Sequence, residues 1–379
     1  MAPHSISFGI LSSSPPTPCG IATFTTALSA ALVRQGAEVR IVRILDDPEA
    51  RPDSLVPIIE ELIASDRSSI IPAIRAVNSC DVAIIQHEYG LYGGSDGDDV
   101  LSVLEGLRVP SIAILHTVLP HPTTHQLEVL NEVIRRVDGV VVMSKSARDV
   151  LCRVYEVRSD QVSIIPHGAA VERSPMVRTI GDRPMLLTWG LIGPGKGIEW
   201  AIDAMATLKD LNPKPLYVIA GRTHPKVLAF AGDAYRESLI QRVADNGVDD
   251  MVSFDNSYRS QLSLHQLIAR SDFVVLPYDS REQATSGVLV DAVAAGRPVI
   301  ATAFPHALEL LRTGAGIVVE HQNVGELSAA LRRALTEPAV ALAMQNEAKR
   351  IAPSLSWDTV GSRFRDLAAQ VLQRVGADA

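Results

Sequence analysis

Short apolar runs alternate with amphipathic stretches along the whole chain. In the first half, runs rich in Val, Ile and Leu occupy residues 6–12, 38–44, 82–87, 111–116, 139–144 and 162–166. Nearly continuous apolar runs of this length are typical of strands that are buried on both faces. The stretches between them, such as 24–35 and 125–136, have the periodicity of helices. This alternation predicts a mostly parallel β-sheet with helices packed on it.

The second half repeats this architecture without repeating the sequence. Its strand-like runs occupy residues 185–189, 216–220, 251–254, 272–276, 298–302 and 316–319. Helical patterns follow at 324–335 and 340–351, and a last amphipathic stretch at 357–374 comes after the interruption at Pro353. Residues 166–183 lack apolar periodicity, so we interpret them as a hinge between two doubly wound α/β domains. Facing domains of this type would enclose a ligand-binding cleft at the carboxyl ends of their strands.

Composition agrees with two globular domains and excludes several classes of function. The chain has 379 residues, 47% of them hydrophobic, and a formal net charge of −8, which disfavours nucleic acid as a partner and a polybasic membrane anchor. No apolar run approaches the roughly 18 residues of a transmembrane helix, and no basic N-terminal segment precedes a long apolar stretch. The three cysteines, Cys19, Cys80 and Cys152, are too widely spaced to predict a zinc site or a disulfide framework. We therefore expect a cytoplasmic protein with at most peripheral membrane contact, through a short basic helix such as 131–136; the alternative, which we prefer, is that 125–136 is an ordinary solvated helix face.

Polar residues follow several of the predicted strands in the first half. The first strand leads into a Ser/Pro-rich loop that ends at Cys19 and Gly20, where a helix begins, so backbone N–H groups there could approach an anion. This loop lacks the G-x-G-x-x-G fingerprint, which disfavours a dehydrogenase. His87 and Glu88 follow the third strand, and His116 follows the fourth, so their side chains are expected in one crevice. Each could instead be an ordinary loop residue, and the spacing matches none of the usual zinc patterns.

In the second half, a glycine-rich loop between Gly190 and Gly197 follows a strand and opens a helix. It contains Gly195 and Lys196, one of only six lysines in the chain. Glycines allow the backbone to approach a phosphate closely, and an ammonium supplies a compact charge. A glycine stands where the Walker A motif requires Ser or Thr, which disfavours a P-loop ATPase or kinase. The alternative is a surface lysine beside flexible glycines.

A second candidate anion site follows the strand at 272–276. Thr285, Ser286 and Gly287 stand at the mouth of a helix, where hydroxyls, backbone donors and the helix dipole favour an anion. Asp291 comes eight positions after Gln283, so the two would lie on a similar helical face, two turns apart.

Together these motifs resemble the retaining nucleotide-sugar glycosyltransferases of the family four type, which have the GT-B fold. The resemblance covers nearly the whole chain and is most specific in the segment 291–299 and in the terminal helix. It implies two Rossmann-like domains that face a central cleft. It further implies an acceptor-binding domain at 1–168, a hinge at 169–183, a donor-binding domain at 184–355, and a C-terminal helix at 356–379 that crosses back to the N-terminal domain.

The resemblance also implies roles for particular residues. Catalytic roles fall to His116, Lys196 and either Gln283 or Glu282. The donor would be bound by Gly190, Gly195, Arg222, Thr285, Ser286, Gly287, Val288 and Asp291. The acceptor and the reacting phosphate would meet Cys19, Gly20, His87 and Glu88. No metal ion or other cofactor is implied.

The sequence departs from the family pattern at three positions. Gln283 and Asp291 stand where the family has a pair of glutamates, and an amide at 283 is restricted to hydrogen bonding with sugar hydroxyls. Leu191 stands where the family has an arginine, so the diphosphate lacks one bidentate partner, which Arg222, Arg259 or Arg281 could replace. The runs 281–283, 285–287 and 223–225 are similar to a subset of related enzymes, which indicates a coherent variant.

The function that the resemblance implies is transfer of a hexose, with retention, from a GDP- or UDP-sugar to a hydroxyl of a glycan, a glycolipid or a small molecule. Such a reaction requires stabilisation of the departing diphosphate and no nucleophilic triad. Two alternatives stay open: a non-catalytic relative that binds sugar nucleotides or glycans, and a sugar phosphorylase or epimerase with the same fold.

Overall fold

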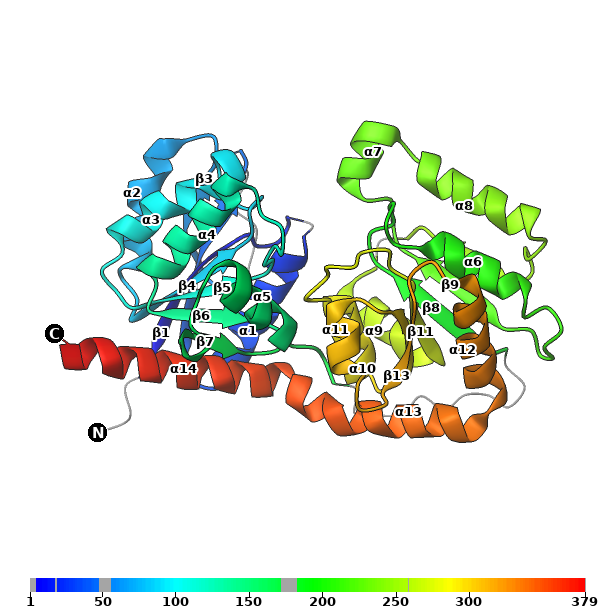
Figure 1. Ribbon diagram of the computed structural model, residues 1–379. Helices are drawn as coiled ribbons and strands as arrows, with labels where there is room; N and C mark the ends of the chain where they lie inside the picture. Colours follow the sequence, from blue (N-terminus) through cyan, green and yellow to red (C-terminus); the bar gives the residue numbers. More distant parts are fainter. Residues whose placement is uncertain (1–4, 18, 48–55, 172–182, 258, 379) are drawn as a thin grey trace. The chain divides into compact units, whose positions relative to one another are not determined.

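A computed structural model of the chain describes all residues except 1–4, 18, 48–55, 172–182, 258 and 379. The chain divides into two compact units (Figure 1). The N-terminal unit comprises Met1–Gly168 and Trp357–Ala379, and the C-terminal unit comprises Ala169–Ser356. Most of the predicted hinge lies outside the described residues. No helix among the described residues is long and apolar enough to cross a membrane.

The N-terminal unit is built on a seven-stranded parallel sheet in the order β3-β2-β1-β4-β5-β6-β7. Its strands are β1 (Ser7–Ser12), β2 (Glu38–Leu45), β3 (Ile58–Ile63), β4 (Val82–His87), β5 (Ser111–Leu115), β6 (Gly139–Val142) and β7 (Val162–Ile164). Its α-helices are α1 (Gly20–Arg34), α2 (Ile70–Val77), α3 (Asp99–Gly106), α4 (Thr124–Arg136), α5 (Lys145–Val154) and α14 (Trp357–Asp378). Short 3₁₀ turns occupy Arg67–Ser69, Ser95–Gly97 and Ser159–Gln161.

The six strands predicted for this half are confirmed, and one further strand, β3, was missed. It lies at the sheet edge, and Leu62 is its one buried residue. Its sequence includes Glu60 and Glu61, which break the apolar run by which the other strands were recognised. A structural contact explains the presence of Glu61 in this strand. Its Oε1 lies 2.6 Å from Nη2 of Arg43, whose fully buried guanidinium belongs to β2. A buried cation requires such a partner, so the polar edge strand is tied to the core.

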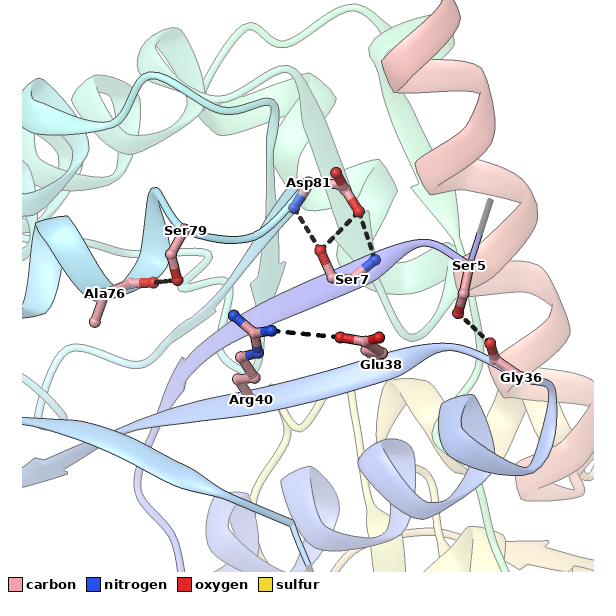
Figure 2. Close-up of polar contacts among 8 residues, drawn as sticks. All are labelled: Ser5, Ser7, Gly36, Glu38, Arg40, Ala76, Ser79 and Asp81. Atoms are coloured by element: carbon pink, nitrogen blue, oxygen red, sulfur yellow. Dashed lines mark hydrogen bonds and ion pairs between the residues drawn. The ribbon is translucent and has the colours of Figure 1, made fainter. Parts of the chain in front are cut away.

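Polar contacts fix the amino ends of the central strands. The Asp81 carboxylate, just before β4, accepts hydrogen bonds from the Ser7 N–H (2.8 Å) and hydroxyl (2.6 Å) at the start of β1 (Figure 2). The same hydroxyl accepts from the Asp81 N–H at 2.9 Å. Nearby, Ser5 donates to the Gly36 carbonyl, and Arg40 pairs with Glu38 on β2. These contacts leave the opposite, carboxyl end of the sheet for the loops that carry the candidate chemistry.

The C-terminal unit has a six-stranded parallel sheet in the order β10-β9-β8-β11-β12-β13. Its strands are β8 (Met185–Trp189), β9 (Leu216–Ala220), β10 (Val252–Asp255), β11 (Phe273–Leu276), β12 (Val299–Thr302) and β13 (Gly316–Val319). Its helices are α6 (Ile198–Ala206), α7 (Pro225–Ala231), α8 (Ala234–Asp245), α9 (Gln261–Arg270), α10 (Gly287–Ala294), α11 (Pro305–Leu310), α12 (Val324–Thr336), α13 (Pro338–Ile351) and the 3₁₀ turn Ala352–Leu355. All six predicted strands are confirmed, and the strand order is that of a doubly wound sheet.

The terminal helix α14 packs against α1 of the N-terminal unit, as predicted (Figure 1). Val360, Phe364, Ala368 and Val371 recur on one helical face and join the buried cluster around the first strands. Gly361 permits the close approach, because a Cβ there would lie 2.9 Å from the Cβ of Ala31 on α1.

Truncating this helix face should weaken the N-terminal unit. Phe364 is 1% exposed, so Phe364→Ala is expected to lower the free energy of unfolding by about 3–5 kcal/mol through lost burial and the cavity left behind. Phe230, which is 93% exposed on α7, supplies a matched control whose replacement by Ala should change stability by less than about 0.5 kcal/mol. Hydrogen exchange followed by mass spectrometry on β1 and β4 peptides measures the effect. Equal protection in the two variants would contradict this packing.

Candidate functional site

The glycine-rich loop of the C-terminal unit connects β8 to α6 and lies against the segment that follows β11. Gly190, Gly195 and Gly197 have φ of +122°, +85° and +61°, where side chains are strained. A Cβ at Gly197 would lie 1.7 Å from the carbonyl oxygen of Pro277, and the Asp279 N–H donates to the Gly195 carbonyl at 3.0 Å. Gly197 is therefore required by the contact between the two loops, whereas Gly190 and Gly195 are favoured by their positive φ alone.

Lys196 lies over the aromatic ring of Tyr278. Its Nζ is 4.4 Å from the ring centroid, and Tyr278 is 1% exposed. Burial lowers the pKa of Lys196, and among the described residues no acidic side chain pairs with it. The aromatic face stabilises the ammonium through a cation–π contact. A partly dehydrated cation without a carboxylate partner can attract an anionic ligand strongly.

Helix α10 begins at Gly287, directly after Thr285 and Ser286, as the sequence predicted. The Ser286 hydroxyl caps the helix by accepting from the Leu289 N–H at 3.3 Å. The Ser286 N–H does not have the role suggested by the sequence, because it donates to Nδ1 of His306 at 2.8 Å. The first-turn N–H groups of Gly287 and Val288 have no hydrogen-bond acceptor within the part of the chain that the structure describes. These two amides, together with the helix dipole, remain for an anion.

Gln283 lies in the loop, as expected, but four residues before α10 begins, so it does not share a helical face with Asp291. Its Nε2 donates to the Thr285 carbonyl at 3.2 Å, which braces the loop and leaves Oε1 to accept from a ligand hydroxyl. Burial raises the pKa of Asp291, on α10, to about 7. Glu282 is exposed.

The candidate arginines differ in their surroundings. The Ile192 N–H donates to the Arg222 carbonyl at 2.8 Å, which places that residue beside the glycine-rich loop. A Cβ at the adjacent Gly221 would lie 1.8 Å from the carbonyl oxygen of Gly190, so the end of β9 and this loop are in close contact. Arg259 is instead held by Asp255, with Nε 2.9 Å from Oδ2, and donates to Ser263. Of these two arginines, Arg222 is therefore the one that lies beside the glycine-rich loop.

The N-terminal unit brings together the residues that follow β4 and β5. The His116 N–H donates to the His87 carbonyl at 3.0 Å, and the ring Nε2 of His116 lies 2.6 Å from Oε1 of Gln86. With the Gln86 amide in this orientation, its oxygen accepts from Nε2 of His116, and Nδ1 of that ring can accept in turn. Glu88 accepts from the Thr117 hydroxyl at 2.5 Å and from the Tyr89 N–H at 3.1 Å. Sequence reasoning missed Gln86, which looks like an ordinary strand residue.

Three buried imidazoles in this unit are neutral near pH 7. Burial lowers the pKa of His116 to about 3, with smaller contributions from His167 and His87, and lowers the pKa of His87 and of His167 to about 4. Phe24, on α1, contacts the rings of His116, His167 and Trp357 at centroid distances of 5.1, 5.2 and 5.1 Å. This aromatic cluster joins α1, the hinge entry and α14, and sequence reasoning did not predict it.

Cys19 and Gly20 stand at the N-terminus of α1. Cys19 caps the helix, since its Sγ accepts from the Ala22 N–H at 3.3 Å and lies 3.0 Å from the Ser13 hydroxyl. A Cβ at Gly20 would meet no other atom within 4 Å, so the space beside it is open to a ligand. Among the described residues, no group of three or more His, Cys, Asp or Glu side chains is arranged to hold a metal ion.

Two known families match successive parts of this chain. Residues 18–173 match the family described as Glycosyltransferase Family 4, and residues 173–351 match the family described as Glycosyl transferases group 1. The chain is 25% identical to the alpha-D-kanosaminyltransferase of Streptomyces kanamyceticus over 70% of this chain and 72% of that protein. It is 24% identical to the phosphatidyl-myo-inositol mannosyltransferase of Propionibacterium freudenreichii over 66% of this chain but only 62% of that enzyme.

Solved structures share the whole architecture. The structure of HepE from Anabaena in complex with UDP and glucose superimposes with a TM-score of 0.74 at 17% identity, covering 96% of this chain and 100% of that one. At such low identity the similarity shows the fold alone, which is GT-B, as predicted.

The neutral imidazoles predict how stability depends on pH. His87 has a pKa of about 4 when folded, below its ordinary value of 6.5, so between these values the unfolded chain binds more protons. The free energy of unfolding of the N-terminal unit should therefore fall as the pH is lowered from 6.5, with a share from His87 of at most about 1.4 kcal/mol per pH unit. His87→Gln should reduce this slope in urea unfolding at pH 5, 6 and 7.

The matched control is His125→Gln on the surface. There Asp96 raises the pKa of His125, so this imidazole stabilises the fold at low pH and loses that effect as the pH rises through its folded pKa. The slope change should thus have the opposite sign in the control. Identical slopes in both variants and the parent would show that His87 is not held neutral.

Proposed function

Because the chain belongs to the glycosyltransferases of family 4 and group 1 and has their GT-B fold, we propose that it is a retaining hexosyltransferase using a nucleotide diphosphate sugar. The donor is a GDP- or UDP-sugar, and the acceptor is a hydroxyl of a glycan, a glycolipid or a small molecule. UDP and glucose in the HepE complex, and the sugar transfer named for the two curated relatives, support this assignment.

In this proposal the donor binds residues 184–355 of the C-terminal unit, with its diphosphate at Lys196 and the first turn of α10. The observation that carries the assignment is the Lys196 ammonium, partly dehydrated over Tyr278 and without an acidic partner among the described residues. Negative charge on the diphosphate grows as the sugar leaves, so a fixed cation and the Gly287 and Val288 amides would stabilise the transition state more than the bound donor. Asp291 would hydrogen-bond the ribose, and Gln283 or Glu282 the sugar hydroxyls.

The acceptor binds residues 1–168 of the N-terminal unit, near Gly20, Glu88 and His116. A neutral His116, with its proton directed to Gln86, offers Nδ1 as an acceptor for a sugar hydroxyl. Gly20 leaves open space beside the amides at the start of α1. The acceptor hydroxyl would then attack the sugar on the face from which the diphosphate departs, which retains the anomeric configuration. No metal is assigned a role.

Removing the ammonium tests the proposal. Lys196→Ala should lower kcat/KM for the preferred donor about 100-fold or more, because the developing diphosphate charge loses its cation. Release of nucleotide diphosphate from UDP-, GDP- and ADP-sugars, with and without acceptor, measures the rate. Lys214→Ala is the matched control: that lysine is an exposed residue of the same unit paired with Asp250, and its loss should leave turnover unchanged.

The same donor panel separates the alternatives. Tight donor binding without turnover on any acceptor would favour a non-catalytic relative, and phosphate-dependent cleavage of a disaccharide would favour a phosphorylase. Exchange of a sugar C–H proton with deuterated water would favour an epimerase. A wild-type protein that neither binds nor turns over any donor, with Lys196→Ala indistinguishable from it, would refute the proposed function.

A further inference from the structure

One buried histidine contacts both ends of the loop that leads into α10. His306, the second residue of α11, is 4% exposed. Its ring Nδ1 accepts from the Ser286 N–H at 2.8 Å, and the backbone N–H of His306 donates to the Gln283 carbonyl at 3.3 Å. Since a backbone amide only donates, Nδ1 carries no proton, and the neutral ring carries its proton on Nε2. Neither the sequence pattern nor the resemblance singled out this residue.

The segment around His306 also supports the ring beneath Lys196. Phe304 is fully buried and stacks on Tyr278, with ring centroids 5.4 Å apart and planes 25° from parallel. The Thr302 hydroxyl donates to the Tyr278 carbonyl at 2.6 Å. The end of β12 and the start of α11 therefore hold both the aromatic ring under the ammonium and the loop in front of α10.

The contact with Ser286 determines where the free amides of α10 lie. Ser286 is the N-cap, and its backbone leads directly into the Gly287 and Val288 amides. A buried N–H requires an acceptor, and the His306 ring is the acceptor in this structure. Without it, the Ser286 N–H would have to turn toward water, and the next two amides would move with it.

We propose that His306 is a positioning residue for donor binding: its Nδ1 fixes the orientation of Ser286 and so aligns the first-turn amides of α10 with the diphosphate that Lys196 binds. This inference rests on the proposed function. His306 does not itself contact the donor in this assignment; it acts through the backbone of the loop.

Three substitutions separate the acceptor atom from the volume of the ring. In His306→Asn the side-chain Oδ1 stands close to the place of Nδ1 and can accept from Ser286, whereas in His306→Gln the acceptor moves to the place of Nε2. His306→Leu removes it. We expect His306→Leu to weaken the affinity for the donor nucleotide diphosphate by about 10- to 100-fold, since small misplacements of binding groups have effects of this size. His306→Asn should stay within about threefold of wild type, and His306→Gln should resemble His306→Leu.

Two measurements make the outcome decisive. Calorimetric binding of UDP and GDP gives the affinity, and hydrogen exchange at the Ser286 amide, resolved by NMR, reports the contact without any donor. Exchange should accelerate in His306→Leu and His306→Gln and stay slow in His306→Asn. His265→Leu on α9 is the matched control and should change neither readout.

The proposal and its premise fail in different ways. A wild type that binds no nucleotide refutes the proposed function, while the Ser286 exchange rates still test the contact. Unchanged affinity in His306→Leu, or equal losses in His306→Asn and His306→Gln, would overturn the positioning role, because the acceptor atom would then not matter. If His306→Leu does not fold, as thermal denaturation would show, the comparison of Asn with Gln decides alone.

Discussion

Parallel strand order is the constraint on which every candidate functional group depends. In a parallel sheet all carboxyl ends meet at one edge, so loops far apart in the sequence become neighbours. In the C-terminal unit, β8, β11 and β12 are adjacent, and the segments that follow them carry Lys196, Ser286 and His306. In the N-terminal unit, β4 and β5 are adjacent in the same way; β4 ends at His87, and His116 directly follows β5. The sheet thereby creates groups of side chains that no local segment could assemble.

The proposed anion site would explain how an acidic chain binds a dianionic ligand. Net charge acts over the whole surface and is screened by salt, whereas Lys196 and the first turn of α10 act over a few ångströms. Burial of the ammonium costs free energy, as its lowered pKa indicates, and the Tyr278 ring offsets only part of that cost. A bound diphosphate would supply the missing counter-charge, so donor binding and the stability of this loop would be thermodynamically linked.

Sequence reasoning predicted the parts of the fold that depend on apolar periodicity, and it missed those that depend on partners distant in the sequence. Twelve of the thirteen strands are predictable because each carries a short apolar run, whereas β3 is a polar edge strand explained by the buried Arg43. Lys196 stood out because glycines surround it. His306 did not stand out, because a single histidine after a strand forms no recognisable motif. Its role as acceptor for the Ser286 N–H depends on the pairing of β11 with β12, which the local sequence does not reveal.

The amide at Gln283 follows from the same loop geometry. Its Nε2 donates to the Thr285 carbonyl, and that carbonyl precedes the Ser286 N–H held by His306. A glutamate at this position could not donate, and its charge would face a carbonyl oxygen, so the loop would lose one brace and gain a repulsion. Gln283 and His306 thus both stabilise the loop segment 283–286 in front of α10. An amide at this position is therefore compatible with an intact site, provided that the remaining Oε1 is the atom that meets the sugar.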